Sequence, residues 1–205
     1  SCVSLTCDNN REVLVTALQD WIVSHPDALT AADYDALPEE ICRRIEIVDG
    51  AILLSPSPRR SHQNVAYGFT SALKAAVDVG LAVAIDVDLR LQDVPLLNRR
   101  PDVVVYDASL PDDAVLRPQH CVLVVEVMSP GSVTTDRVDK PGEYAAAGIE
   151  HFWRVENIDD ADHGLTVFRY RLDPMTHTYA PTGIDSGTLT VTDPVKLTVG
   201  LADLR

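Results

Sequence analysis

The sequence has little positive charge and no long apolar run. Lysine and arginine total 17 against 31 acids, which gives a formal net charge of −14. Electrostatic attraction supplies most non-specific affinity for nucleic acids, so this balance argues against such a partner. No apolar segment approaches the roughly 20 residues that span a bilayer, and no basic-then-apolar signal is visible at the N-terminus. We therefore expect no membrane partner and a cytoplasmic protein.

Cysteine is also scarce, and its four copies do not form a metal-binding pattern. Cys2, Cys7, Cys42 and Cys121 lack the paired spacing of a zinc ribbon and have no histidine-rich partner nearby. Cys121 lies in an apolar run, which predicts a buried thiol. The spacing favours structural or incidental thiols over a zinc site.

The positive charge that is present is unevenly placed. Residues 1–40 hold eight acids and one arginine, whereas six of the 17 basic residues form adjacent pairs: Arg43-Arg44, Arg59-Arg60 and Arg99-Arg100. The pairs lie two or three residues before Glu46, His62 and Asp102, respectively. They are either solvated loop charge or a local positive rim for a polyanion.

The first third of the chain predicts helices and a hairpin. Residues 12–22 have helical periodicity, and Thr30 with Asp33 resembles a capping box that begins a helix ending near Ala36. Asp49-Gly50 between two apolar runs predicts a β-hairpin over residues 44–54. We expect a tail and helix over residues 1–28, followed by one domain over residues 29–205.

The middle of the chain predicts a helix and then strands. Ser61 begins a helix that ends at Gly80, and residues 81–91 form one long strand or two. Residues 94–100 are expected to be a loop, and residues 102–106 a strand. Residues 121–128 are apolar on both faces, which is typical of the middle of a covered sheet.

The last third is rich in strand patterns. Residues 151–155 predict a strand, an antiparallel meander is expected over residues 165–171, 177–180 and 188–191, and residues 196–199 close the chain. The fold class is therefore α+β: one mixed sheet with helices on its faces and a β-rich C-terminal third.

Glu126 is the strongest candidate for a functional residue. It lies in an otherwise apolar strand, and alternation places Val124, Glu126 and Met128 on one face, with Cys121, Leu123, Val125 and Val127 on the other. A sheltered carboxylate without a cation or proton is costly. Lys140 could neutralise Glu126 as an ion pair. A divalent metal held jointly with Asp102 is the alternative, although an aspartate at a strand entrance is also a common turn residue.

The order Pro101-Asp102, Glu126 and Lys140 is similar to that of the PD-(D/E)XK nuclease superfamily. More specifically, the chain resembles the Uma-type restriction endonucleases through RRIEIVDGAILLSPSP with His62-Gln63, RPDVVVYD, LVVEVMSPGS and AGIEHFWRVE. The resemblance covers residues from about 30 to 170. It implies a restriction-endonuclease-like core, Asp102 and Glu126 as ligands of Mg²⁺ or Mn²⁺, Lys140 as the catalytic lysine, and Glu46 close by.

The chain departs from the superfamily pattern at the lysine. The pattern has lysine two residues after the second acid, where this chain has Met128. The family places its lysine in the following helix, which fits Lys140. Because Pro141 follows, we expect Lys140 at the entrance of that helix.

These residues predict metal-dependent hydrolysis of phosphodiester bonds in DNA. The predicted substrate contacts are Arg59, Arg60, His62, Gln63, Arg99, Arg100 and Tyr144. His62 and Gln63 could contact a phosphate, and Tyr144 could fix Lys140 or only pack. The alternative is a catalytically degenerate protein of the same fold that binds DNA or a protein. A third hypothesis, compatible with either function, is a homodimer formed through the β-rich C-terminal third.

Overall fold

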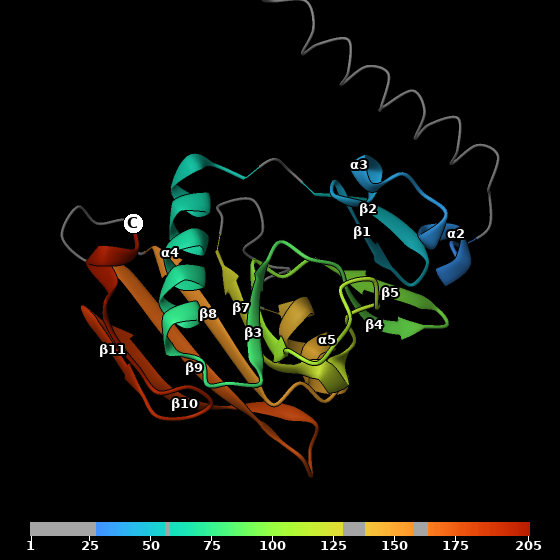
Figure 1. Cartoon of the computed structure of the whole chain (residues 1–205). Coiled ribbons are helices and arrows are strands. Elements are labelled where there is room, and N and C mark those ends of the chain that lie inside the picture. The colour runs from blue at the N-terminus through green and yellow to red at the C-terminus, as the bar shows by residue number, and fades with distance from the viewer. Residues whose placement is uncertain (1–27, 56–57, 129–137, 158–163) are drawn as a thin grey trace, which may run out of the picture. The chain divides into compact units, whose positions relative to one another are not determined.

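The computed structural model describes residues 28–55, 58–128, 138–157 and 164–205, which divide into two compact units (Figure 1). Unit 1 comprises Ser1–Pro56 with Gln92–Asn98, and unit 2 comprises Ser57–Leu91 with Arg99–Arg205. The predicted tail and the helix over residues 12–22 lie outside the described residues. The prediction of a single domain from residue 29 onward stays a prediction.

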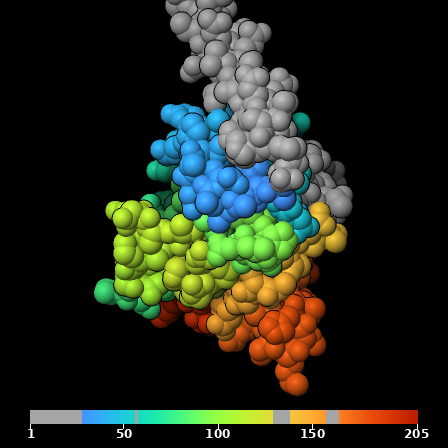
Figure 2. Space-filling view, turned by 90° about the vertical axis from the view of Figure 1, so that its right-hand side faces the viewer, coloured from blue at the N-terminus to red at the C-terminus, as the bar shows by residue number. Residues whose placement is uncertain are grey.

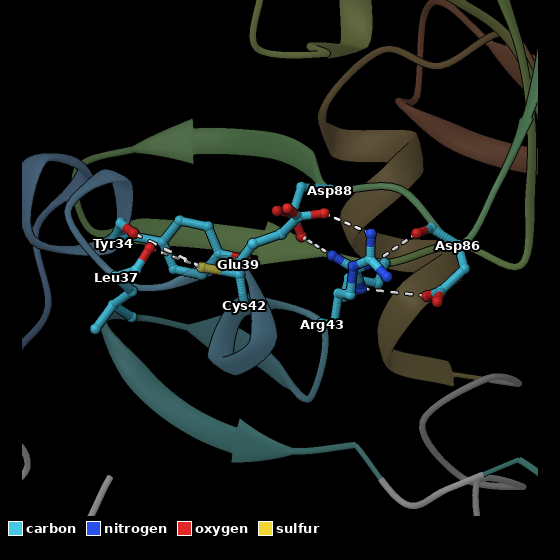
Figure 3. A network of polar contacts seen from close by, with 8 residues as sticks. Tyr34, Leu37, Glu39, Cys42, Arg43, Asp86 and Asp88 are labelled. Atoms are coloured by element: carbon cyan, nitrogen blue, oxygen red, sulfur yellow. Dashed lines mark hydrogen bonds and ion pairs between the residues drawn. The ribbon is translucent and has the colours of Figure 1, made fainter. Parts of the chain in front are cut away.

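The described part of unit 1 contains two short helices, α2 (Ala31–Asp35) and α3 (Glu39–Cys42). The predicted capping box is confirmed. The backbone N–H of Asp33 donates to Thr30 Oγ1 over 3.2 Å, and the backbone N–H of Thr30 donates to Asp33 Oδ2 over 3.0 Å. Cys42, at the end of α3, is buried, and its sulfur points toward the carbonyls of Tyr34 and Leu37 (Figure 3). This thiol therefore packs inside unit 1 as a structural residue.

The predicted hairpin is also confirmed in unit 1. Strands β1 (Ile45–Val48) and β2 (Ala51–Leu54) pair antiparallel around Asp49-Gly50. Both turn residues have positive φ, 51° and 77°, as a two-residue type I′ turn requires. The strands belong to a four-stranded sheet in the order β2-β1-β5-β4.

Two strands lie where the sequence pattern was ambiguous or failed. Residues 81–91 divide into β3 (Leu81–Ile85) and the start of β4 (Leu89–Asp93), with Asp86 at a φ of 51° between them. The prediction of a loop over residues 94–100 is wrong, because β5 (Leu96–Arg99) occupies most of it. Pro95 and the buried polar pair Asn98-Arg99 mask the alternation that would identify a strand.

Unit 2 is built on a six-stranded mixed sheet in the order β10-β9-β8-β7-β6-β3. Its remaining strands are β6 (Val103–Asp107), β7 (Cys121–Val127), β8 (His151–Asn157), β9 (Leu165–Asp173) and β10 (Thr178–Ser186). The pairing of β7 with β8 is parallel, whereas the pairs β3-β6, β6-β7, β8-β9 and β9-β10 are antiparallel. The predicted mixed sheet is confirmed.

Helices cover both faces of this sheet (Figure 1). The long helix α4 (Arg60–Ala76) packs Phe69 and Leu73 against Leu123 and Val125 of β7. The short helix α5 (Lys140–Ala146) packs Tyr144 on the opposite face, in the cluster that contains Val124. Strand β7 is therefore buried from both sides, as its continuous apolar pattern predicts.

One residue of β7 lies on a different face from the one predicted. Cys121 packs with Val124 rather than with Leu123, because the pairing of β6 and β7 shifts register between Val105 and Tyr106. Such a bulge inserts an extra residue and reverses the alternation beyond it. The prediction of a buried thiol is confirmed, and burial raises the pKa of Cys121 to about 12.

The C-terminal third is strand-rich, as predicted, but its last strands leave the meander. Strands β8, β9 and β10 form an antiparallel meander, and the hairpin tip between β9 and β10 projects from unit 2, with Met175 91% exposed (Figure 2). Strand β11 (Thr188–Val191) instead pairs with β12 (Leu197–Gly200) in a two-stranded sheet. Short 3₁₀ helices lie at Pro118–His120 and Leu201–Leu204.

The architecture is therefore the predicted α+β class. No helix in the described part of the chain is long and apolar enough to cross a membrane.

Candidate active site

Asp102 and Glu126 meet across two neighbouring strands of unit 2. In the antiparallel pairing of β6 and β7, Val103 lies opposite Val125, so the next position along this register sets Asp102 opposite Glu126. Residues opposite each other in a sheet point to the same face, with their Cβ atoms about 5 Å apart. The sheet itself thus brings together two acids that are 24 positions apart in the sequence.

Asp102 links the end of β7 to the start of α4. Its Oδ2 accepts a 2.7 Å hydrogen bond from the backbone N–H of Val127 and lies 3.2 Å from Nε2 of His62. The Asp102 side chain remains 20% exposed, and that of His62 is 15% exposed. The carboxylate is therefore fixed by two groups while one side stays open to solvent.

Glu126 is the most enclosed acid of the site, with its side chain 2% exposed. Its Oε1 accepts a 2.6 Å hydrogen bond from Tyr144 Oη and lies 3.1 Å from Nζ of Lys140. Both partners come from α5. The prediction that Glu126 is sheltered is confirmed, and the ion pair with Lys140 is present.

Lys140 is the first residue of α5, which confirms its predicted place at the helix entrance. Pro141 follows in the first turn, where its missing N–H interrupts no helical hydrogen bond. The backbone restriction imposed by Pro141 therefore does not keep the Lys140 ammonium from Glu126. Tyr144 lies one turn further along, is fully buried and contacts Glu126, so its predicted contact with a substrate stays a prediction, which this burial does not favour.

Exposed polar residues gather at the beginning of α4, next to His62. Arg59 is the N-cap residue of this helix, and Arg60, His62 and Gln63 occupy its first turn. Arg59, Arg60 and Gln63 are exposed. Because His62 contacts Asp102, these three residues lie on the same helix turn as a direct neighbour of the candidate site.

The pair Arg99-Arg100 has a different setting from the one predicted. Arg99 is 2% exposed and forms two hydrogen bonds, of 2.6 Å and 2.7 Å, to the carboxylate of Glu143 on α5. Arg100 pairs with Asp86 and Asp88. The charge of both arginines is offset internally. A DNA contact by these two residues stays a prediction, which this pairing does not favour.

Two other predicted residues are not tested against this site by the described structure. Glu46 is 8% exposed on β1, and it belongs to unit 1, whereas Asp102, Glu126 and Lys140 belong to unit 2. Its catalytic role stays a prediction. From its place in the sequence, three residues after Glu126, Ser129 could orient that acid, but Ser129 lies outside the described residues.

Comparison with known proteins identifies the family. A family model described as "Uma2: Putative restriction endonuclease" matches residues 31–202, most of the chain. The chain belongs to the Uma2 family. The resemblance predicted from the sequence motifs is thereby confirmed.

A solved structure has a similar fold. It is described as the crystal structure of a putative nuclease belonging to DUF820 from Anabaena variabilis ATCC 29413. The alignment has a TM-score of 0.60 and 17% sequence identity, and it covers 86% of this chain and 97% of the other. At that identity the match supports the nuclease-like fold alone. No curated protein matches this Uma2 chain.

The acids of this Uma2 protein suit a hard divalent metal. Among the described residues, no group of three or more histidine, cysteine, aspartate or glutamate side chains could hold a metal ion. Mg²⁺, however, is usually bound through one or two carboxylates together with waters and substrate phosphates. The pair Asp102 and Glu126, with the Val127 carbonyl nearby, fits that requirement.

Sequence reasoning missed two charged residues beside the site. Glu143 holds Arg99, and Arg154 lies opposite Glu126 in the parallel pairing of β7 with β8. The alternation of Phe152, Arg154 and Glu156 in β8 could have shown which face Arg154 occupies. The sequence carried no signal that β8, which contains Arg154, would pair with β7, which contains Glu126.

Proposed function

We propose that this chain hydrolyses phosphodiester bonds in DNA with Mg²⁺ or Mn²⁺ bound by Asp102 and Glu126. The observation that carries this proposal is the placement of both acids on one face of the sheet, with Lys140 beside Glu126. Membership of a family described as restriction endonucleases supports the class of reaction.

Each residue of the site has a distinct role in this proposal. When bound, the metal supplies a water of lowered pKa and stabilises negative charge on the phosphate. Lys140 provides a positive charge that offsets the charge developing on the phosphate. Tyr144 holds Glu126 in place through its 2.6 Å hydrogen bond, and His62 with the Val127 N–H holds Asp102.

The start of α4 is the proposed contact for the DNA backbone. Arg59, Arg60 and Gln63 are exposed there, and the first turn of this helix contains no acid. Unpaired N–H groups at a helix N-terminus attract phosphate, and two arginines add to that attraction. This local charge is how a chain with a net charge of −14 would approach DNA.

DNA cleavage by isosteric variants tests the proposal. Asp102→Asn and Glu126→Gln should each reduce cleavage in Mg²⁺ or Mn²⁺ by about 100-fold or more, because each removes a negatively charged metal ligand. Asp112→Asn is the matched control, since Asp112 is exposed and lies beyond the far end of β6 from Asp102. Circular dichroism verifies folding. Equal activity in the wild type and both site variants would reject the mechanism.

One observation favours the alternative of a non-catalytic binding protein on the same fold. Lys140 and Tyr144 already contact Glu126, so this acid does not need a metal for charge compensation. Calorimetric titration with Mn²⁺ separates the two functions. Binding in the wild type that is lost in Glu126→Gln supports the hydrolase, whereas no binding in either supports the alternative. A homodimer and a cytoplasmic location stay predictions; size-exclusion chromatography at two salt concentrations tests the dimer.

A further inference from the structure

A pocket of about 260 Å³ opens on the α5 side of the sheet in unit 2. Its lining comes from α5, β8, β9 and the start of β10, and includes Gly142, Phe152, Arg154, Tyr170 and Tyr179. Pockets for drug-sized ligands measure roughly 300–1,000 Å³. The volume of this pocket suits a single planar ring system.

Three aromatic rings form one wall of the pocket. The ring of Phe152 lies 5.8 Å from that of Tyr170 at 30°, and 5.4 Å from that of Tyr179 at 23°. Tyr179 Oη donates a 2.9 Å hydrogen bond to the Ile149 carbonyl, which fixes its ring. Burial raises the pKa of Tyr179 far above its ordinary value, so the ring stays neutral. The rings of Tyr170 and Tyr179 lie 6.5 Å apart and are tilted by 51° to each other, so the wall is an angled aromatic surface against which another flat ring can pack.

The pocket adjoins the candidate active site along both the sheet and the helix. Arg154 lines the pocket and lies opposite Glu126 on the neighbouring strand, about 4.8 Å away in the sheet. Pro141 and Gly142 also line the pocket and directly follow Lys140. The pocket and the candidate active site therefore lie on the neighbouring strands β8 and β7 and share the first turn of α5.

Arg154 gives the pocket a polar edge. Its guanidinium carbon lies 4.6 Å from the centre of the Phe168 ring and 5.7 Å from that of Tyr170. Its Nε is 2.7 Å from Glu156 Oε1, a distance typical of an ion pair, although the angle is not that of a hydrogen bond. The guanidinium thus lies over the Phe168 ring and beside Tyr170 of the wall, where it can donate to a ring with acceptor atoms on its edge.

We propose that this pocket binds an unpaired nucleobase of the strand held at Asp102 and Glu126, an inference that rests on the proposed function. A nucleobase offers a flat face to the aromatic wall and acceptor atoms to Arg154. In a duplex, both faces of a base are covered by its neighbours, so only an unstacked base can enter. The substrate class is therefore single-stranded DNA, or duplex DNA with a displaced base.

Filling the pocket tests this inference. A Cβ added at Gly142 meets no atom within 4 Å, so Gly142→Leu occupies open space with little strain. Ala146→Leu is the matched control, because Ala146 is exposed on the same helix and does not line the pocket. Tyr170→Leu is a second variant that removes one ring of the wall. Thermal unfolding verifies that each variant is folded.

The readout is the affinity for single-stranded oligonucleotides in which one abasic site is moved along the strand by one nucleotide at a time. Fluorescence anisotropy is measured in Ca²⁺ and again in EDTA, so that the readout does not depend on cleavage. In the wild type and Ala146→Leu, one abasic position should weaken binding about tenfold. Gly142→Leu and Tyr170→Leu should bind the intact strand about tenfold more weakly than the wild type does. In these two variants, an abasic site should have the same small effect on affinity at every position of the strand.

The outcomes separate this inference from the proposed function. A flat abasic profile in the wild type, absence of oligonucleotide binding, or an unchanged profile in both pocket variants overturns the nucleobase pocket. If the profile is as expected but no DNA is cleaved in Mg²⁺ or Mn²⁺, hydrolysis fails while the pocket stands. If DNA is cleaved and the profile is flat, only the pocket fails.

Discussion

Tyr144 Oη and Lys140 Nζ reach the same oxygen, Oε1 of Glu126, at 2.6 Å and 3.1 Å. The two residues are four positions apart on α5 and so lie on one face of the helix. The packing of this single helix against the sheet therefore sets the surroundings of the buried acid. Changes on α5 should alter both stability and the proposed chemistry.

Removing the Tyr144 hydroxyl should weaken the fold moderately. Tyr144→Phe keeps the ring in its fully buried position but deletes a hydrogen bond to a charged group, which is worth about 2 kcal/mol. Urea unfolding measures the change in free energy. Tyr67→Phe is the control, because Tyr67 is 70% exposed and should shift stability by less than about 0.5 kcal/mol. Equal effects of the two substitutions would contradict the hydrogen bond.

Breaking the ion pair at Lys140 should have a larger effect. Lys140→Met leaves Glu126 buried without its cation, and breaking such a pair costs about 3–5 kcal/mol. The double variant Lys140→Met with Glu126→Gln should recover much of that loss, because it removes the charge from both partners. Chemical unfolding of the wild type, both single variants and the double variant gives the coupling energy. A coupling near zero would show that the two groups do not interact in solution.

Arg99 should act as a structural residue. Arg99→Lys keeps the charge but loses the two-pronged contact with Glu143. We expect a loss of roughly 2 kcal/mol in unfolding free energy, with the DNA affinity of the folded protein unchanged. Glu143→Gln should destabilise the fold in the same direction. A variant with normal stability and weakened DNA binding would instead support the DNA contact predicted from the sequence.

Arg59 and Arg60 should behave in the opposite way. Both are exposed, so Arg59→Ala and Arg60→Ala should leave stability within about 0.5 kcal/mol of the wild type. The logarithm of the affinity falls as the logarithm of the salt concentration rises. If each arginine contacts one phosphate, each substitution should make this negative slope shallower by about 0.9. Arg43→Ala, in an exposed ion pair of unit 1 (Figure 3), is the control. Unchanged salt slopes would remove α4 as the DNA contact.

His151 should make stability depend on pH. It is 5% exposed on β8, and burial lowers its pKa; Arg171 acts in the same direction, while Asp193 and Glu150 oppose it. Below pH about 6.5 the unfolded chain takes up the proton more readily than the folded one. His151 therefore contributes stability above that pH that is lost as the pH falls through its folded-state pKa.

Comparison with His151→Gln isolates this contribution. Unfolding free energies measured between pH 7.5 and 5 should decline more steeply in the wild type, by at most about 1.4 kcal/mol per pH unit. Parallel pH profiles for the two proteins would show that His151 is not responsible.

Local patterns predicted much of the fold. The capping box at Thr30, the turn at Asp49-Gly50 and the apolar run of β7 each involve neighbours in sequence, and each was correctly placed. The failures concern non-local pairing. Strand β5 is short, its polar residues are buried by other segments, and Cys121 changes face because of a bulge between two strands.

The features of the candidate site also separate into those that local sequence predicts and those that depend on tertiary packing. The sequence by itself determined that Glu126 would be sheltered, because alternation in an apolar strand requires only local backbone geometry. Its motifs also determined the family and the order of Asp102, Glu126 and Lys140. Only the tertiary structure decided that Lys140 and Tyr144 share one oxygen of Glu126, that Arg99 is held by Glu143, and that Arg154 borders an aromatic pocket. Those relationships depend on which strands and helices become neighbours, which the packing of the whole sheet sets.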